Sequence, residues 1–411
     1  MQTKLSPAYQ QTKQGQEAEA ILRACVHCGF CTATCPTYQL LGDELDGPRG
    51  RIYQIKLILE GEQATPTIRT HLDRCLTCRS CETTCPSGVR YGRLVDIGRE
   101  LIEAQTERPW LERVQRKALR SILPYPQRFR SLLAVAYLVK PALPISLAQK
   151  LPPQQGKRYH WSPKPQQRKV IAFDGCVQSV VTPSTNAAAA RVLEKLGIEL
   201  VRVAQAGCCG AVSQHLAAPD EALAFMRRNI DAWWPLIEAG AEAILFSASG
   251  CGVMIKDYAQ LLKQDADYAA KAERVSALAK DLSEIIAETE LGTTHIPAHL
   301  KKVAFHSPCT LQHGLRLAGL IESILQKAGF ELTPVANAHL CCGSAGTYSL
   351  LQPKLAQQLL ANKLSHLQDP QPQVIASANI GCQMHLATAA TIPVVHWIEL
   401  LDQALADPLW N

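Results

Sequence analysis

Residues 25–36 read CVHCGFCTATCP, and residues 75–86 read CLTCRSCETTCP. Both stretches follow one pattern, C-x2-C-x2-C-x3-C-P, which is the spacing with which a chain wraps a cubane iron–sulfur cluster. Three cysteines separated by two residues each can reach three irons, and the proline after the fourth cysteine redirects the chain. The duplicated pattern predicts two [4Fe–4S] clusters and therefore a protein that moves single electrons.

In two-cluster ferredoxins the fourth cysteine of each run serves the other cluster. The same crossing here divides the eight cysteines into two ligand sets. Set I consists of Cys25, Cys28, Cys31 and Cys85. Set II consists of Cys75, Cys78, Cys81 and Cys35. The crossing predicts that the two clusters lie close together, which suits electron transfer between them.

Two other uses of these cysteines, zinc binding and disulfide formation, fit the pattern less well. Zinc sites usually show two C-x2-C pairs rather than runs of four cysteines that end in Cys-Pro. Structural disulfides need an oxidising compartment, whereas residues 1–21 contain no apolar segment typical of a secretory signal. The pattern therefore favours clusters, and we expect a cytoplasmic protein.

Composition excludes several classes of function. The net charge of +6 is not concentrated in basic runs, so binding of nucleic acid is not expected. The most apolar stretch, LLAVAYLV at 132–139, is far shorter than the roughly 18 to 20 apolar residues that span a bilayer. We expect it to form a buried core helix, or else to dock against a partner. Any work at a membrane is expected to be that of a peripheral subunit.

The 411 residues should form two or three domains. Residues 1–110 are predicted to be a helical ferredoxin-like domain, since helical periodicity flanks both cysteine runs. Cations at Arg49, Arg51 and Arg90 could balance cluster charge there. Residues 111–168 read as a helical and then proline-rich linker, stiff and exposed over 149–168.

The remainder of the chain is an internal duplication, with a first repeat at 169–290 and a second at 291–411. The first repeat contains Cys176, Cys208, Cys209 and Cys251. The second contains, in register, Cys309, Cys341, Cys342 and Cys382. Glycine follows each adjacent pair, and KVIAFDGC at 169–176 matches KVAFHSPC at 302–309.

Each repeat reads as a β–α–β–α–β unit whose cysteines follow the carboxyl ends of strands, where parallel sheets place their ligands. The expected fold class is thus α+β and α/β: a helical ferredoxin-like domain followed by two duplicated α/β Cys-Cys-Gly units. Each repeat's four thiols could bind a metal ion or a further cluster, act as redox dithiols, or be structural. Any of five nearby histidines could assist them: His215, His306, His313, His339 and His385.

No catalytic residue is predicted. The chain shows no Ser-His-Asp grouping, no G-x-G-x-x-G motif and no Walker loop. We therefore expect flavin or nicotinamide chemistry to belong to a partner protein.

The two cysteine runs, the stretch LLGDELDGPRGRI at 40–52 and the two Cys-Cys-Gly repeats closely resemble the iron–sulfur subunit of bacterial glycolate oxidase. The resemblance implies a hetero-oligomeric oxidoreductase. FAD-containing subunits would oxidise glycolate to glyoxylate, and this chain would relay electrons towards a membrane quinone, from the cytoplasmic face of the inner membrane.

Iron–sulfur subunits of lactate and anaerobic glycerol-3-phosphate dehydrogenases, and heterodisulfide reductase-like enzymes, are similar and remain alternatives. The chain departs from the last group because Cys251 and Cys382 lack a further cysteine three residues on. That departure leaves the unusual clusters of those enzymes in question here.

Overall fold

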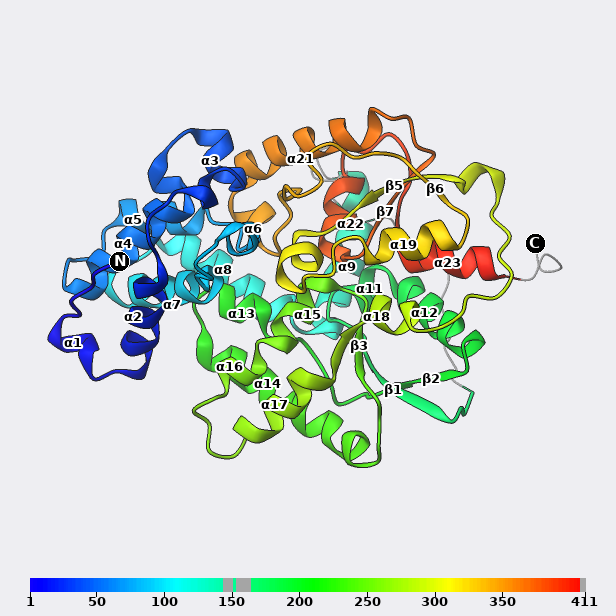
Figure 1. Cartoon of the computed structure of the whole chain (residues 1–411), viewed down its shortest axis with the longest axis horizontal. Helices are drawn as coiled ribbons and strands as arrows, with labels where there is room; N and C mark the ends of the chain where they lie inside the picture. The colour runs from blue at the N-terminus through cyan, green and yellow to red at the C-terminus, as the bar shows by residue number, and fades with distance from the viewer. Residues whose placement is uncertain (143–150, 153–163, 407–411) are drawn as a thin grey trace.

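The computed structural model describes residues 1–142, 151–152 and 164–406. Most of the linker predicted at 149–168 lies outside the described residues. Helices form the N-terminal region, and the first strand among the described residues begins at Arg168. The N-terminal region lies against one end of the two repeats (Figure 1).

The N-terminal region is helical throughout, and its elements pack around an apolar core supplied mainly by α2, α4 and α7. Proline opens several of these helices, where its fixed φ and missing N–H are tolerated. Its elements are α1 (Pro7–Gln10), α2 (Lys13–Ala24), η1 (Phe30–Thr32), α3 (Pro36–Leu41), η2 (Glu44–Asp46), α4 (Pro48–Glu60), α5 (Pro66–Asp73), α6 (Ser80–Thr84) and α7 (Tyr91–Gln105).

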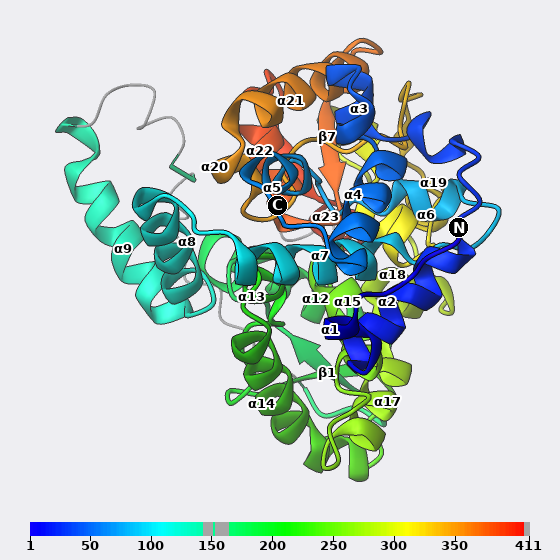
Figure 2. The same ribbon diagram turned by 90° about the vertical axis from the view of Figure 1, so that its left-hand side faces the viewer.

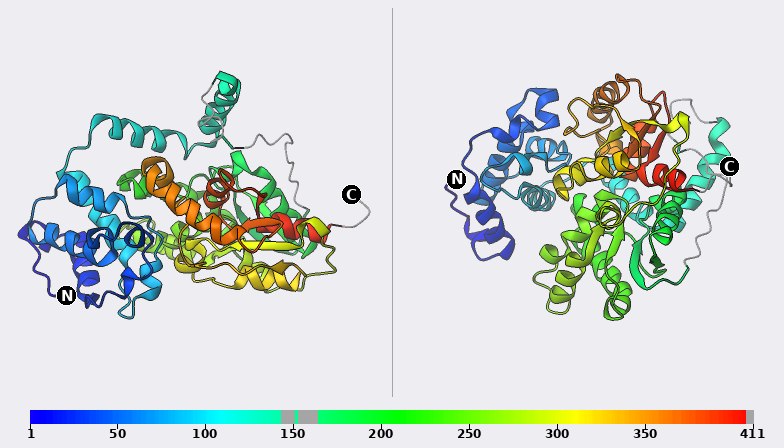
Figure 3. Two further views of the ribbon diagram at one scale, coloured as in Figure 1. Left: turned by 90° about the horizontal axis from the view of Figure 1, so that it is seen from above. Right: turned by 45° about the vertical axis from the view of Figure 1, so that its right-hand side comes forward.

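Two helices, α8 (Trp110–Ile122) and α9 (Pro126–Val139), follow one another and end in η3 (Lys140–Ala142). They lie to one side of the molecule (Figure 2) and meet at a steep angle (Figure 3), and they are called the arm below. The stretch 132–139 is part of α9, and Leu138 is 81% exposed. The expectation of a buried core helix there was wrong, because the described part of the chain leaves most of its apolar side chains uncovered.

The first repeat forms a parallel four-stranded sheet in the order β2-β1-β3-β4. Its elements are β1 (Arg168–Phe173), α11 (Gln178–Val181), α12 (Pro183–Lys195), β2 (Ile198–Arg202), α13 (Ala211–His215), α14 (Pro219–Glu238), β3 (Ile244–Phe246), α15 (Ser249–Lys256), α16 (Tyr258–Leu261), α17 (Ala269–Leu278), β4 (Ala279–Asp281) and α18 (Leu282–Ala287).

The second repeat has the same topology, β6-β5-β7-β8, again all parallel. Its elements are η4 (Ala298–Leu300), β5 (Lys302–His306), η5 (Thr310–Gly314), α19 (Leu320–Lys327), β6 (Glu331–Leu332), α20 (Tyr348–Leu351), α21 (Pro353–Gln368), β7 (Val374–Ser377), α22 (Ile380–Ala387), β8 (Val394–His396) and α23 (Trp397–Leu405). The fourth strand of each sheet extends the predicted three-stranded unit.

The two repeats share one core. Along β1, Val170 and Ala172 point into a cluster that also contains Val303 and Phe305 of β5, whereas Ile171 and Phe173 point to the opposite face. Helices α12 and α18 of the first repeat and α19 and α23 of the second line this common cluster. The two sheets therefore enclose a layer of helices drawn from both copies (Figure 1).

Polar contacts hold the N-terminal region against both repeats. Arg79 forms an ion pair with Asp257 of the first repeat. Thr83 Oγ1 lies 2.9 Å from His313 Nδ1 of the second repeat, and His313 Nε2 lies 3.0 Å from the backbone carbonyl oxygen of His339. The cysteine runs therefore face the repeats rather than standing apart from them.

Candidate metal centres

The cysteines of set I line one cavity of the N-terminal region. Cys25, Cys28 and Cys31 come from the loop between α2 and α3, and Cys85 comes from the end of α6. Cys81 of set II also reaches this cavity. Burial, followed by the neighbouring Cys25, raises the pKa of Cys31 to about 11. A thiol in this position needs a nearby cation to ionise, and the irons of a bound cluster would supply that charge.

The cysteines of set II are buried. Burial is the main cause that raises the pKa values of Cys78 and Cys81, and the nearby Cys35 raises both further. Cys35 belongs to the first run and the other two to the second. Thiols of the two runs therefore lie close to one another.

Equivalent backbone turns shape both loops. His27 and Thr77 occupy the same place in the two runs, with φ of 57° and 52°. Gly29 and Arg79 occupy the next equivalent place, with φ of 82° and 59°. Three of these four residues carry a side chain in a left-handed conformation, which costs free energy. Both runs thus adopt one loop geometry, held in place by the surrounding helices.

Cations surround Cys75. Burial opposes ionisation of this thiol, but the charges of Arg51 and Arg99 and a hydrogen bond from Tyr91 lower its pKa. The Tyr91 hydroxyl lies 3.5 Å from Cys75 Sγ. Arg51 is itself 1% exposed and also bonds to Asp46. Of the three arginines singled out in the sequence, Arg51 is the one buried beside set II.

Each repeat arranges its four thiols as a row. Cys176 Sγ lies 3.6 Å from Cys208 Sγ, and Cys309 Sγ lies 3.9 Å from Cys341 Sγ. In the first repeat, hydrogen bonds from Cys176 and Cys209 hold the pKa of Cys208 well below its usual range. All sixteen cysteines of the chain are free thiols in this structure.

The glycine after each cysteine pair is required by backbone geometry. Gly210 and Gly343 have φ of 93° and 90°. A Cβ at Gly343 would lie 2.7 Å from the carbonyl oxygen of Ala356. The turn that brings the adjacent thiols into the row therefore excludes larger residues.

Set II adjoins the second repeat directly. Cys78, Cys309 and Cys341 lie in one buried cluster, together with Leu76 and Leu359. The apolar side chains exclude water from the space between the thiols. The structure thus brings together cysteines that the sequence placed in separate domains.

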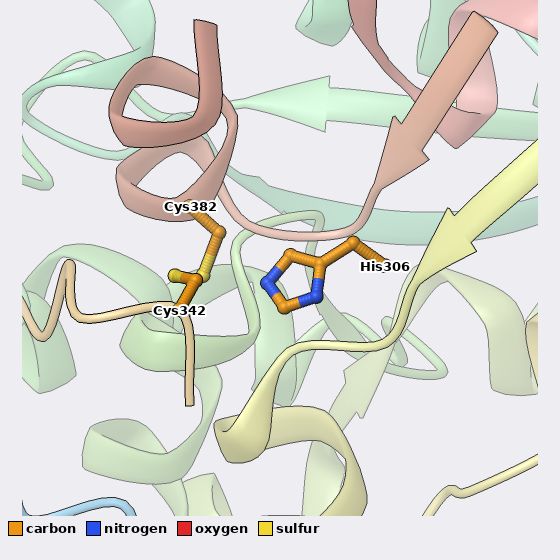
Figure 4. Close-up of side chains that lie close together, drawn as sticks. All are labelled: His306, Cys342 and Cys382. Carbon is orange, nitrogen blue, oxygen red and sulfur yellow. The ribbon is translucent and has the colours of Figure 1, made fainter. Parts of the chain in front are cut away.

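One histidine of the five joins a cysteine row. In the second repeat, ligand atoms of His306, Cys342 and Cys382 all lie within 4.8 Å of one another (Figure 4). His313 and His385 instead pair with backbone carbonyls, and His215 pairs with Asp96. His339 belongs to no converging group of metal-ligand atoms found among the described residues.

Two further features lie beyond the predicted sites. Lys363 of α21 is 2% exposed, and its charge acts on all four thiols of the second repeat. A second converging group, Asp43, Asp46 and His71, is already tied to Arg51 and Arg74 by ion pairs. Sequence pattern alone signals neither, since a lone lysine in a helix and scattered acids are ordinary.

The chain matches two protein-family models over three segments. Residues 21–89 match a 4Fe-4S dicluster domain. Residues 170–256 and 303–387 each match a cysteine-rich domain. The first match contains both cysteine runs, and the other two contain the two thiol rows.

Three relatives are informative. The chain is 55% identical over 98% of its length to a protein of Escherichia coli K12 named glycolate oxidase iron-sulfur subunit, covering 99% of it. It is 28% identical over 94% of its length to a probable glycolate oxidase iron-sulfur subunit of Bacillus subtilis, covering 94% of it. It is also 28% identical, over 57% of its length, to lactate utilization protein A of Bacillus velezensis, covering 99% of that protein.

A crystal structure of a hypothetical protein from Helicobacter pylori has a similar fold. The TM-score is 0.57 at 12% sequence identity, and the match covers 97% of this chain and 74% of the other. At that identity the likeness concerns the fold alone.

Proposed function

Because this chain belongs to the family of glycolate oxidase iron–sulfur subunits, we propose that it accepts electrons from an FAD-containing subunit that oxidises glycolate to glyoxylate and passes them to a membrane quinone. The observation that carries the proposal is the placement of the thiols in the N-terminal region. The thiols of set I line one cavity, in which Cys28 is exposed, and Cys81 of the buried set II lines the same cavity. [4Fe–4S] clusters bound by sets I and II would supply the one-electron steps.

The residues around these thiols have distinct tasks. Cys25, Cys28, Cys31 and Cys85 would hold one cluster, and Cys35, Cys75, Cys78 and Cys81 the other. Arg51 and Arg99 place positive charge beside set II, which favours the more negative, reduced state of a cluster there.

We place the flavoprotein partner at set I. Cys28 is exposed, and the apolar side chains of Val26 and Phe30 beside it are 67% and 61% exposed. A partner that covers Val26 and Phe30 would bury apolar surface and bring its flavin near the cavity. Electrons would thus enter where the thiols approach the surface.

We place the membrane at the arm. Its exposed apolar side chains include Trp110, Leu111, Val135 and Leu138. Exposed cations, among them Arg113, Lys117, Arg130 and Lys140, accompany them. Apolar and basic side chains on the same helices are the features of a surface that binds anionic lipid. No described helix is long and apolar enough to cross a bilayer, so the arm would lie on the membrane.

The test is reduction by substrate under anaerobic conditions. The purified chain should contain about eight irons, as two cubanes require. EPR signals of reduced clusters should appear on addition of glycolate only when the FAD-containing subunit is present. Fewer than about four irons with tightly bound zinc, or intact clusters that glycolate never reduces in the complex, would refute the proposal.

Lactate oxidation is the second candidate. The similarity to lactate utilization protein A favours it, but that similarity covers only 57% of this chain. Glycolate and D-lactate, supplied in turn to the same complex, separate the two substrates by their rates of cluster reduction.

A further inference from the structure

The two repeats differ at one buried position next to the thiol rows. His306 is the last residue of β5, three residues before Cys309. Phe173 is the last residue of β1, three residues before Cys176. Phe173 packs edge-on against Trp233, with ring centroids 6.0 Å apart, and so completes an apolar core. The imidazole of the second repeat occupies the equivalent strand position.

His306 has a buried nitrogen with no partner. The residue is 2% exposed, and its Nε2 atom has no hydrogen-bond partner in the structure. A buried polar atom without a partner is costly, and its presence calls for an explanation. The ring points towards Cys342 and Cys382 (Figure 4). Burial, and then the charge of Lys363, keep the pKa of His306 well below its usual value.

The spacing of these atoms suits one ion rather than a cubane. Ligand atoms at zinc distances of about 2.0 Å (nitrogen) and 2.3 Å (sulfur) lie roughly 3.5–3.8 Å apart around a tetrahedron. The three atoms already lie within 4.8 Å of one another. In a cubane site each thiolate binds a different iron, so the sulfur atoms do not converge on one point. In the described part of the second repeat, Cys309 and Cys341 belong to no such converging group.

We propose that His306, Cys342 and Cys382 bind one divalent metal ion of the zinc class, at a site that the first repeat lacks. Two thiolates and one imidazole match the three-ligand class of zinc sites, which keeps its fourth position for water or another molecule. The nearby Lys363 adds positive charge, and its Nζ atom is held by the carbonyls of Asn337 and Ala338 at 2.9 and 3.3 Å. Zinc does not change its oxidation state, so this site is independent of the proposed electron transfer.

The test counts metals in the full-length chain with its clusters bound. After anaerobic incubation with Zn²⁺ and desalting, about one zinc ion per chain should remain. X-ray absorption at the zinc edge should show sulfur and imidazole ligands. His306→Phe, which reproduces the residue of the first repeat, should lose this zinc and keep its iron. His306→Gln, which keeps a polar side chain, should do the same.

His339→Phe is the matched control, because it removes a different imidazole of the same repeat; it should keep the zinc. Three results would overturn the proposal: no zinc in the wild-type chain, zinc retained by His306→Phe, or a loss of about four irons in His306→Phe, which would show a cluster at this site. Cluster EPR and reduction by glycolate, measured on the same samples, test the electron-transfer role separately.

Discussion

Cys78 of set II and Cys341 of the second repeat lie in one buried cluster of contacting side chains. The contact joins a loop near the N-terminus to a turn more than two hundred residues later. Set II, rather than set I, is thereby the ligand set next to the second repeat. The proposed grouping of cysteines into sets I and II would consequently decide the order of the two proposed clusters along the molecule.

Paired substitutions test that grouping. Cys25→Ser with Cys85→Ser removes two ligands from set I alone, so about four irons should remain. Cys75→Ser with Cys85→Ser removes one ligand from each set, so both clusters should be damaged. Iron analysis and EPR distinguish the two variants. If instead the second pair leaves one cluster intact, each run binds its own cluster and the crossed assignment is wrong.

Arg51 should be important for both stability and potential. Its guanidinium is buried and donates to the carbonyl of His71 at 2.7 Å and to Thr37 Oγ1 at 3.1 Å. Arg51→Gln breaks a buried ion pair with Asp46 and should lower the free energy of unfolding by about 3–5 kcal/mol. It should also lower the potential of a cluster in set II, because a positive charge is lost.

Arg74→Gln is the control for Arg51→Gln. Arg74 also pairs with Asp46, but its side chain is 32% exposed. Denaturant unfolding should show a clearly smaller loss for this variant. Equal losses in the two variants would contradict a special role for the buried guanidinium.

Two equivalent helices have N-cap residues whose pKa values are shifted in opposite directions, so the two caps should stabilise the protein in different pH ranges. Asp281 caps α18 and His396 caps α23, each in a capping box. Burial raises the pKa of Asp281 to about 6, so its contribution to stability is present below about pH 4 and lost as the pH rises through 6. Burial lowers the pKa of His396 to about 4, so its contribution is present above about pH 6.5 and lost as the pH falls through 4.

Urea unfolding between pH 4 and pH 8 measures both effects, each worth about 3 kcal/mol at full extent. Asp281→Asn should gain stability relative to wild type as the pH rises. His396→Asn should flatten the acidic side of the profile. Unchanged pH profiles in both variants would show that these two side chains do not titrate as their burial implies.

Gly343 can be tested against a neighbouring glycine. Gly346 also has a positive φ, of 62°, but a Cβ there would meet no atom within 4 Å. Gly346→Ala should cost about 1–2 kcal/mol of stability from backbone strain alone. Gly343→Ala adds a clash with Ala356 and should cost more, with loss of metal from the second repeat. The measurement is thermal unfolding of the two variants. Equal decreases in their unfolding temperatures would contradict the steric requirement at Gly343.

Membrane binding by the arm is tested with vesicles. Leu138→Asp removes an apolar contact worth about 1.5–3 kcal/mol and should weaken binding to anionic vesicles about tenfold or more. Leu350→Asp, at a leucine 52% exposed outside the arm, is the control and should bind normally. Co-sedimentation at low and high salt is the measurement. Equal binding by both variants would place the membrane contact elsewhere.

Much of this architecture could be predicted from local pattern. The duplicated cysteine spacing indicated the repeats, and β-branched runs placed the cysteines after strands. The short strands β4 and β8, three residues each, carry too little pattern to be seen. The arm was misjudged because apolarity does not reveal whether a neighbour covers a helix.

The role of His306 could not be chosen from the sequence alone. Five histidines lay near cysteines, and only the tertiary structure shows which nitrogen is buried beside two thiols. One signal was available in the sequence. When the two repeats are aligned, His306 takes the position of Phe173. A polar residue in place of an aromatic one marks a position where the two copies differ in their tasks.

The layer of helices shared by the two sheets explains how such differences could arise. Arg191 of α12 pairs with Asp402 of α23, and the carbonyl of Ser247 accepts a hydrogen bond from His396. Neither copy can be excised without exposing the apolar face that the other covers. The pair is, in effect, a homodimer made permanent within one polypeptide. Because the two copies are separate segments of one chain, a substitution in one does not change the other. Each copy could therefore acquire chemistry that the other does not need.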